Sequence, residues 1–248
     1  MCLIVFAWRA HKDYPLIVAA NRDEFHARPT EDAHWWPDRP GILAGRDLKA
    51  GGTWLAASKA GRFATITNYR EQSASGSNFR SRGDLVAEFI FNGDGPLPYC
   101  SNIESSLYAG FNLVTADRDS ICYVSNRGDP ATLLRPGIYG LSNASLDTPW
   151  SKLTRTRQRL AALIRSDAIS ESNLLEALAD RQTAIEDASA EHPSLENARA
   201  ITAPFIVTGQ YGTRCSTVLL WHSSGATEFV ERRFSPTGES TGLSRFSF

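Results

Sequence analysis

The strongest constraint on the fold of this chain is a set of strand-like segments that are apolar at both alternating positions. Leu16–Ala20 shows the pattern most clearly, because it reads Leu-Ile-Val-Ala-Ala without a polar residue. A strand with one face in water alternates apolar and polar side chains, whereas a strand covered on both faces does not need to. The pattern therefore predicts sheets that are covered on both faces by further layers of structure.

Short breaks rich in turn residues separate several of these segments into pairs. Two apolar runs joined by a few turn residues are typical of a β-hairpin, in which the runs form antiparallel neighbours. The sequence predicts four hairpins, which pair Leu3–Trp8 with Leu16–Ala20, Trp54–Ser58 with Phe63–Asn68, Gly110–Ala116 with Ile121–Ser125, and Ser216–His222 with Thr227–Arg233.

Helical patterns are fewer, and they lie between strand-rich segments at either end of the chain. Thr148 and Pro149 offer an N-cap followed by a proline at the first helical position, which is a common helix start. This segregation of helices from strands favours an α+β fold over a repeated βαβ unit. The predicted helices are Gly83–Phe91, Trp150–Arg165, and a segment from Ser170 to about Arg181.

Length and net charge limit the kinds of protein that the chain can be. Its 248 residues suffice for one large domain with a substantial core. Asp187–Ala203 shows little periodicity and predicts a long connection, but no segment reads as a linker between domains, so we predict a single domain over residues 1–248. A formal net charge of −1 gives no electrostatic field that would select nucleic acid or an anionic membrane.

The first apolar segment and the spacing of cysteines and histidines narrow the choice further. Leu3–Trp8 is too short for a membrane span and lacks the order of a secretory signal, which predicts a cytoplasmic protein. The four cysteines contain no CxxC pair, and the five histidines contain no HxxxH or HExxH spacing. Since metal sites and redox dithiols depend on such spacings, we expect no metal site and no cofactor.

Cys2 directly follows an initiator methionine that a small second residue normally allows to be removed. Removal of Met1 leaves one residue with a thiol and a free α-amine, whose pKa is roughly 8. A neutral amine about 3 Å from the thiol can take its proton and so activate the nucleophile. Two interpretations stay open: Cys2 is a nucleophile with its own base, or it is a small buried hydrophobe at the start of a strand.

Charged residues follow the strand predicted over Leu16–Ala20, in the order Asn21-Arg22-Asp23-Glu24. If this strand pairs with the one that begins at Cys2, their ends lie close together. Arg22 can then lower the pKa of the thiol, and Asp23 can orient the amine. Taken alone, the cluster also fits a solvated turn.

Other polar residues stand at the ends of predicted strands. Asn68 and Asn143 carry amide groups, which are neutral donors suited to holding an oxyanion, although an Asx-turn explains such residues equally well. Arg214 enters an apolar strand, where a cation is costly to bury unless a carboxylate or a substrate meets it. Trp54 fits the lining of an apolar pocket or ordinary core packing.

Short motifs in this order give the chain its resemblance to the NRDE family, which is named for transport and Golgi organisation. The likeness runs essentially from end to end of the chain. The matching motifs are Met1-Cys2, Ala20-Asn21-Arg22-Asp23-Glu24-Phe25, Gly52-Thr53-Trp54, Thr67-Asn68-Tyr69, Asn126-Arg127-Gly128, Tyr139-Gly140-Leu141-Ser142-Asn143 and Tyr211-Gly212-Thr213-Arg214.

The same landmarks are more distantly similar to choloylglycine and penicillin V amidases, a branch of the N-terminal nucleophile hydrolases. That resemblance implies an α+β fold with four layers, an αββα sandwich. In the amidases an arginine precedes the asparagine and stands three residues before the aspartate, so the resemblance leaves open which residue of Asn21–Glu24 faces the thiol. It implies catalytic roles for Cys2, Arg22, Asp23, Asn68, Asn143 and Arg214.

The resemblance implies a hydrolase that cleaves a non-peptide amide bond through an acyl intermediate on Cys2. Its partner is a small amide or acyl substrate, which we expect to contact Asn21, Glu24, Trp54 and Tyr69. The NRDE resemblance supports an alternative, a carrier of haem or of an acyl-CoA or lipid-like ligand that does no chemistry. No histidine stands out as a haem ligand, although Cys2 can ligate iron. A purely structural protein is a third interpretation, which leaves the polar strand ends without a use.

Overall fold

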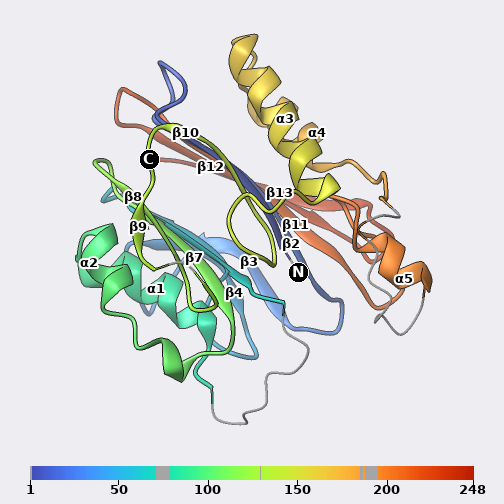
Figure 1. Ribbon diagram of the computed structural model, residues 1–248, viewed down its shortest axis with the longest axis horizontal. Helices are drawn as coiled ribbons and strands as arrows, with labels where there is room; N and C mark the ends of the chain where they lie inside the picture. Colours follow the sequence, from blue (N-terminus) through green and yellow to red (C-terminus); the bar gives the residue numbers. More distant parts are fainter. Residues whose placement is uncertain (1, 71–78, 129, 185–186, 188–194) are drawn as a thin grey trace. The chain divides into compact units, whose positions relative to one another are not determined.

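The computed structural model describes the chain apart from residues 1, 71–78, 129, 185–186 and 188–194. The chain forms two compact units, each with its own antiparallel sheet (Figure 1). The first unit comprises Met1–Ala27, Pro136–Ser142 and Leu146–Phe248, and the second comprises Arg28–Arg135 and Asn143–Ser145. The single domain over residues 1–248 stays a prediction.

The first unit holds a six-stranded sheet in which sequence-distant strands are neighbours. The N-terminal strands lie in its middle, flanked by strands from later in the chain. In spatial order the strands are β10 (Gly137–Leu141), β1 (Cys2–Trp8), β2 (Leu16–Phe25), β11 (Tyr211–Trp221), β12 (Thr227–Phe234) and β13 (Ser240–Ser247).

Helices α3 (Ser151–Arg165) and α4 (Glu171–Leu178) cover one face of this sheet (Figure 1). Their apolar stripes pack on the odd-numbered residues of β1, and the even-numbered residues Ile4, Phe6 and Trp8 are at most 2% exposed as well. Burial at both parities agrees with the apolar pattern of the sequence. The core on the helix side includes Leu3, Val5, Ala7, Ile17, Ala19, Leu153, Leu160, Leu174, Leu178, Val218 and Leu220.

The ends of the helices depart in part from the sequence prediction. Trp150, and not Thr148, is the residue at the N-cap of α3, and a carboxylate oxygen of Asp187 accepts the Ser151 N–H at 2.6 Å. A distant side chain thus supplies a cap that local sequence could not reveal. Helix α4 begins as predicted, with the Ser170 hydroxyl accepting the Asn173 N–H at 3.2 Å, but it ends at Leu178.

The connection predicted over residues 187–203 is wrong in part. It contains a short helix, α5 (Leu195–Ala200), while residues 188–194 of it lie outside the described part of the chain. A helix of six residues is too short for periodicity to reveal.

The second unit holds a seven-stranded sheet whose strands follow one another in chain order. Each strand pairs antiparallel with the next, although the connection from β6 to β7 is long and contains the helices of this unit. The strands are β3 (Thr30–Trp35), β4 (Ile42–Asp47), β5 (Leu55–Ser58), β6 (Phe63–Asn68), β7 (Phe111–Ala116), β8 (Ile121–Ser125) and β9 (Thr132–Leu133).

Helices α1 (Arg82–Asn92) and α2 (Pro96–Ser101) cover one face of this sheet, followed by the 3-10 turn η1 (Ser105–Leu107). Helix α1 confirms the helix predicted over Gly83–Phe91. Helix α1 packs on β4 to β7, where the small side chains of Ala44, Ala56 and Ala64 let it approach the sheet, and α2 packs on β7 and β8. The core comprises Trp36, Ile42, Ala44, Ala56, Ala64, Ile66, Leu85, Val86, Phe89, Ile90, Tyr99, Cys100, Tyr108, Phe111, Leu113, Cys122 and Val124, among others.

All four predicted hairpins are confirmed, as β1–β2, β5–β6, β7–β8 and β11–β12. The sequence did not predict β3, β4, β9 or β13, whereas β10 agrees with the strand expected before Asn143. β13 is mostly polar and half-exposed at the edge of its sheet, and β9 has only two residues, so neither carries a local pattern.

Among the helices in the described part of the chain, none has both the length and the apolar composition needed to cross a membrane.

Leu160 and Leu133 give a matched test of the core of the first unit. Leu160 is 0% exposed beneath α3, whereas Leu133 on β9 is 48% exposed. Leu160→Ala should lower the free energy of unfolding by about 2–5 kcal/mol, because it removes buried methyl groups and leaves a cavity. Leu133→Ala should lower it by less than about 0.5 kcal/mol. Urea unfolding of both variants measures the difference, and equal losses would contradict the core assigned to α3.

Candidate active site

Cys2 is the first residue of β1, where strand pairing places it beside polar residues of β2. In the antiparallel register Cys2 is opposite Arg22, and Arg22 is in turn opposite Cys215 on β11. The Ser142 hydroxyl donates to the Cys2 carbonyl at 2.7 Å and anchors the start of the strand. The partly buried Cys2 side chain is thus fixed on the same side of the sheet as the Arg22 side chain.

Burial dominates the acidity of the Cys2 thiol and raises its pKa above the usual 9.0. The negative charge of Asp23 raises this pKa further, whereas a hydrogen bond from the Asp23 backbone and the positive charge of Arg22 lower it. Arg22 therefore acts in the direction that the sequence predicts, but burial outweighs it. A thiol with a raised pKa is mostly protonated at neutral pH and needs a base before it can act as a nucleophile.

Asp23 is a buried carboxyl group whose surroundings are specific. The Thr213 hydroxyl donates to its Oδ1 at 2.7 Å, and the Tyr211 hydroxyl donates to its backbone carbonyl at 2.9 Å. Burial raises the pKa of Asp23 from 3.8 to about 6, against the opposing effects of Lys152, the Thr213 hydrogen bond and Arg22. A carboxyl group with a pKa near 6 changes its charge close to physiological pH.

Lys152 is a positive charge that the sequence analysis did not single out. It lies in the first turn of α3, is 3% exposed, and donates from Nζ to the Ile201 carbonyl at 3.0 Å. A buried cation at the N-terminal end of a helix is doubly unfavourable, because burial and the helix dipole both oppose it. Its positive charge lowers the pKa of Asp23, and the attraction between the two charges partly offsets the cost of burying Lys152.

Arg214 and Glu24 lie at the outer side of this cluster. The register of β11 shifts between Thr213 and Cys215, so that Arg214 occupies the irregularity. Its guanidinium donates to the carbonyls of Phe25 and His26 at 3.0 and 3.2 Å, and burial followed by the charge of Arg22 lowers its pKa. Glu24 approaches Arg22 to 4.0 Å. The structure therefore gathers Arg22, Asp23, Glu24 and Arg214 around the start of β1.

Asn21 points to the helix side of the sheet. Its side-chain amide donates to the carbonyls of Leu178 and Pro204 at 3.0 and 2.8 Å, and its oxygen accepts the Ser216 hydroxyl at 2.6 Å. The residue is 0% exposed. These contacts favour a packing role for Asn21 over the substrate contact that the resemblance implies.

Asn68 and Asn143 are brought together in the second unit. Asn143 is buried, and its Nδ2 donates to the backbone carbonyl of Asn68 at 2.8 Å, while its own carbonyl accepts the Arg70 N–H at 2.7 Å. Asn68 ends β6 and is exposed. In the chain Asn143 directly follows Ser142, the residue that anchors Cys2.

A buried network that the sequence analysis missed supports this asparagine pair. Asn112 donates to the Thr67 hydroxyl at 3.2 Å and to the Ala144 carbonyl at 3.0 Å, and its oxygen accepts the Tyr123 hydroxyl at 2.9 Å. A fully satisfied buried amide fixes the residues that it joins. Asn112 thereby ties residues 143–145 to the end of β6.

Trp54 and Tyr69 also belong to the second unit. The Trp54 indole lies against Gly45, where an added Cβ would clash with the ring, so only glycine fits under it. Tyr69 continues the β6–β7 pairing through its N–H, which donates to the Gly110 carbonyl at 2.9 Å. Both residues are partly exposed, so the structure leaves their predicted contact with a substrate as a prediction.

His11, Asp13 and Asp167 each place one possible metal-ligand atom within 4.8 Å of the others. However, the His11 Nε2 bonds to Asp167 at 3.0 Å and its Nδ1 accepts the Asp13 N–H at 3.1 Å. Lys12 approaches the same Asp167 carboxylate to 3.3 Å. These contacts favour an ion-pair cluster over a metal site.

Comparisons of the sequence with known proteins agree over nearly the whole chain. The family model described as Transport and Golgi organisation 2 matches residues 1–236. A human protein, Transport and Golgi organization protein 2 homolog, is 39% identical over 259 residues, which cover 94% of this chain and 92% of that protein. The Drosophila melanogaster protein Transport and Golgi organization protein 2 is 26% identical over 274 residues, with 96% and 95% coverage.

The solved structures that are similar to this one include two hydrolases. The Caenorhabditis elegans ortholog of N-acylethanolamine-hydrolyzing acid amidase has a TM-score of 0.53 at 12% identity and covers 88% of this chain and 92% of its own. A mutant conjugated bile acid hydrolase from Clostridium perfringens has a TM-score of 0.56 at 9% identity and covers 100% and 92%. At such low sequence identity, the structural similarity shows a shared fold and no more. It confirms the predicted α+β fold of the N-terminal nucleophile hydrolase type.

The buried carboxyl group of Asp23 predicts a distinct dependence of stability on pH. The pKa of Asp23 is about 6 in the folded chain and near 3.8 when it is exposed, so the folded chain binds the proton more tightly. The free energy of unfolding should therefore fall as pH rises from about 4 to 6, by about 3 kcal/mol for this group. Asp23→Asn should remove that fall.

Urea unfolding at several pH values measures this effect, with Asp32→Asn, an exposed carboxylate on β3, as the matched control. The control should keep the pH dependence of the wild type. An Asp23→Asn chain with an unchanged pH dependence would show that Asp23 is not the titrating group.

Proposed function

The chain belongs to the Transport and Golgi organisation 2 family, and from that membership and the surroundings of Cys2 we propose that it is a cysteine hydrolase of the N-terminal nucleophile type, which cleaves a non-peptide amide bond. The observation that carries the proposal is the position of the Cys2 thiol at the start of β1. There it lies in register with Arg22 and accepts a hydrogen bond from the Asp23 backbone. A thiol that only filled core space would not need a buried carboxyl group with a pKa near 6 beside it.

The two hydrolases described above, which share the fold, support the type of reaction. One is named as an acid amidase that hydrolyses N-acylethanolamine, and the other as a hydrolase of conjugated bile acids. The bile acid hydrolase was solved as a mutant in which the cysteine at its second residue is alanine. A cysteine at the same place in this chain agrees with a shared nucleophile.

The raised pKa of Cys2 sets the first requirement of the mechanism, which is a base. Met1 lies outside the described residues, and in the proposal its removal frees the α-amine of Cys2. The amine takes the thiol proton, and the sulfur attacks the carbonyl carbon of the amide. The tetrahedral intermediate then breaks its carbon–nitrogen bond, and the amine returns the proton to the leaving nitrogen. The amine then takes a proton from water, whose oxygen attacks the carbonyl carbon of the thioester. The carbon–sulfur bond breaks, the acid leaves, and the amine returns the proton to the Cys2 sulfur.

Asp23 and Arg22 have complementary roles in this mechanism. Above its pKa of about 6, Asp23 is a carboxylate that can hold the α-amine of Cys2 and stabilise its protonated form. Arg22 offsets the charge of the thiolate. Lys152 and Thr213 act through Asp23, since both favour its ionised form. They are positioning residues and do not meet the substrate.

The remaining predicted residues enter the proposal through the family resemblance. Asn68 and Asn143 are proposed to stabilise the oxyanion or to position the amine, and Arg214 to contribute to the field of the thiolate. Glu24, Trp54 and Tyr69 are proposed to contact the substrate, which is a small amide or acyl compound.

An acyl adduct on Cys2 is the direct test of the proposal. The full-length protein, with Met1 removal verified by intact mass, is incubated with a panel of N-acyl amides and thioesters. An acyl-sized increase in mass that maps to Cys2 is expected, and it should vanish in Cys2→Ala. Asn68→Ala should form the adduct about 100-fold more slowly, because losing one oxyanion donor costs on the order of 3 kcal/mol.

Cys215→Ala is the matched control, because Cys215 is a buried thiol two strands away in the same sheet whose loss should leave the adduct intact. Saturable binding of haem or an acyl-CoA without any adduct would contradict the hydrolase and support the carrier instead. A chain that retains Met1 yet forms the adduct at full rate would refute the role of the α-amine.

The pH dependence of adduct formation tests the role of Asp23. The rate should fall as pH drops through about 6, because protonation of Asp23 removes the carboxylate. Lys152→Met should move this fall to higher pH by about one unit, since the loss of a nearby positive charge raises the pKa of a carboxyl group. Lys152→Arg should restore the wild-type profile. A profile that does not move in folded Lys152→Met would exclude this coupling.

A further inference from the structure

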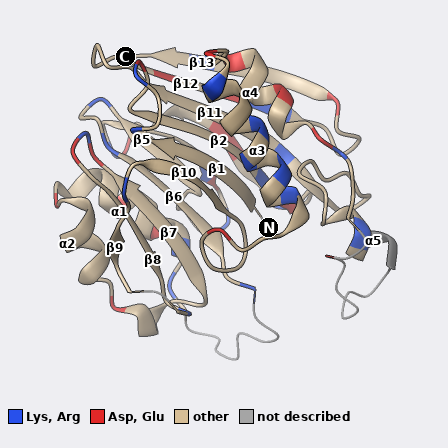
Figure 2. Ribbon diagram, turned by 45° about the horizontal axis from the view of Figure 1, so that its top comes forward, with Lys and Arg blue, Asp and Glu red and all other residues tan. Residues whose placement is uncertain are grey.

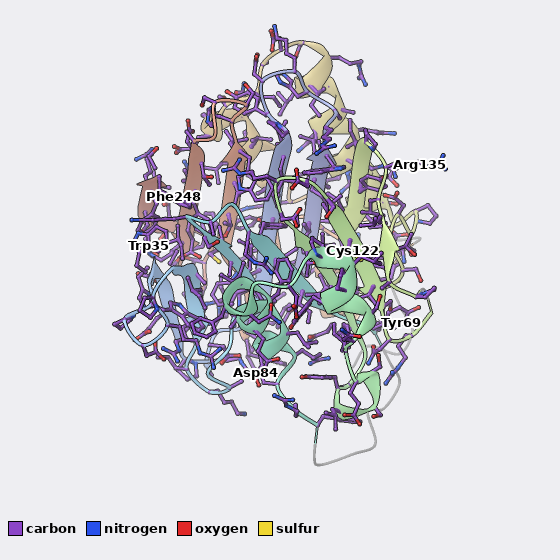
Figure 3. The ribbon with its side chains drawn as sticks, turned by 90° about the vertical axis from the view of Figure 1, so that its left-hand side faces the viewer. Trp35, Tyr69, Asp84, Cys122, Arg135 and Phe248 are labelled. Carbon is purple, nitrogen blue, oxygen red and sulfur yellow. The ribbon has the colours of Figure 1, made fainter. Side chains whose placement is uncertain are left out.

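Two cysteines outside the candidate active site lie together in the second unit. Cys100 is in the last turn of α2, and Cys122 is on β8, where Figure 3 labels it. Both belong to the core between the helices and the seven-stranded sheet, and they are 3% and 0% exposed. The hairpin partner of Cys122 on β7 is Thr115, so three polarisable or polar side chains converge within an apolar core.

Hydrogen bonds distinguish the two thiols from each other. The Cys100 sulfur lies 3.2 Å from the Thr115 hydroxyl, whereas the Cys122 thiol donates to the Tyr123 carbonyl at 3.7 Å. The neighbouring Cys122 side chain and the Thr115 hydroxyl lower the pKa of Cys100, whereas Cys100 and burial raise the pKa of Cys122. Cys100 is therefore the more nucleophilic sulfur, and Cys122 holds the proton next to it.

A partly open cavity of about 430 Å³ reaches Cys100. Its described lining is mixed, with Ser101, Ser125 and Asn126 beside Ile103 and Val124. A cavity of this size admits a small molecule. Cys100 is thus accessible to a small reagent from the cavity even though little of its surface is exposed.

We propose that Cys100 and Cys122 form an oxidisable dithiol that a small hydroperoxide, entering through this cavity, converts to a disulfide. The Cys100 thiolate attacks the terminal oxygen of the hydroperoxide, the oxygen–oxygen bond breaks, and the alkoxide takes up the proton that Cys100 released. The resulting sulfenic acid is then attacked by the Cys122 sulfur. Hydroxide leaves with the Cys122 proton as water, so two thiols are oxidised while one peroxide is reduced.

The position of Cys122 favours the second step over further oxidation. Thr115 contacts the Cys100 sulfur and is opposite Cys122 in the β7–β8 pairing, so the resolving thiol is a near neighbour of the sulfur with which it forms a bond of about 2.05 Å. Cys215 lacks this arrangement, because burial and the charge of Glu231 raise its pKa. The proposal is independent of the hydrolase activity, since it uses no residue of the candidate active site.

Treatment of the folded chain with hydrogen peroxide tests the proposal, in a Cys2→Ala background that removes the Cys2 thiol. Free thiols are then blocked, and the chain is digested without reductant. We expect a peptide pair joined through Cys100 and Cys122 with the loss of two hydrogen atoms. Recovery of both residues as blocked thiols, or of sulfinic acid at Cys100 without a joined pair, would overturn the proposal.

Three variants in the same background sharpen the result. Thr115→Val keeps both sulfurs and the side-chain volume but removes one donor, and it should slow formation of the joined pair about threefold to tenfold. Cys122→Ala should leave a sulfenic acid at Cys100 that dimedone traps. Cys215→Ser should leave the rate unchanged. If Thr115→Val reacts at the full rate, or Cys215→Ser slows the reaction, the assigned surroundings of Cys100 are wrong.

Discussion

Antiparallel pairing of β2 with β1 and with β11 is the constraint on which the candidate active site depends. It sets Cys2 opposite Arg22, and it sets Asp23 opposite Thr213. A slip of one residue in either pairing would turn these side chains to the opposite faces of the sheet. Because the apolar parts of β1 and β2 are buried at both parities, apolar packing alone does not choose between these registers. The hydrogen bonds of Thr213 to Asp23, of Ser216 to Asn21 and of Ser142 to the Cys2 carbonyl depend on the observed register and favour it.

Burial supplies most of the unusual chemistry at this site. It raises the pKa of both Cys2 and Asp23. The charge of Arg22 lowers both pKa values, and the charge of Lys152 and the hydrogen bond from Thr213 lower that of Asp23. Lys152 illustrates the cost, because the first turn of α3 is an unfavourable place for a buried cation. Figure 2 shows further basic residues, coloured blue, along the ribbon of α3. Departures of this kind from the rules of local stability are expected where a protein holds a functional group.

The four cysteines show how far the surroundings decide the behaviour of one side chain. Cys2 begins a strand beside charged groups, Cys215 is buried with a raised pKa, and Cys100 and Cys122 both neighbour Thr115, with Cys100 at the edge of a cavity. The absence of CxxC spacing led the sequence analysis to expect no redox dithiol. Cys100 lies in the last turn of α2 and Cys122 lies on β8, with η1 and β7 between them in the chain. Only the tertiary structure brings the two residues near each other.

Local pattern in the sequence determined the four hairpins, helix α1, the start of α4 and the charged end of β2, because each depends on neighbouring residues. The motifs also identified Cys2, Arg22 and Asp23, which strand pairing brings together. Only the tertiary structure revealed Thr213 and Lys152 beside Asp23 and placed Asn21 in the packing with α4. These contacts join residues more than a hundred positions apart, and burial, which sets their charges, is a property of the folded chain.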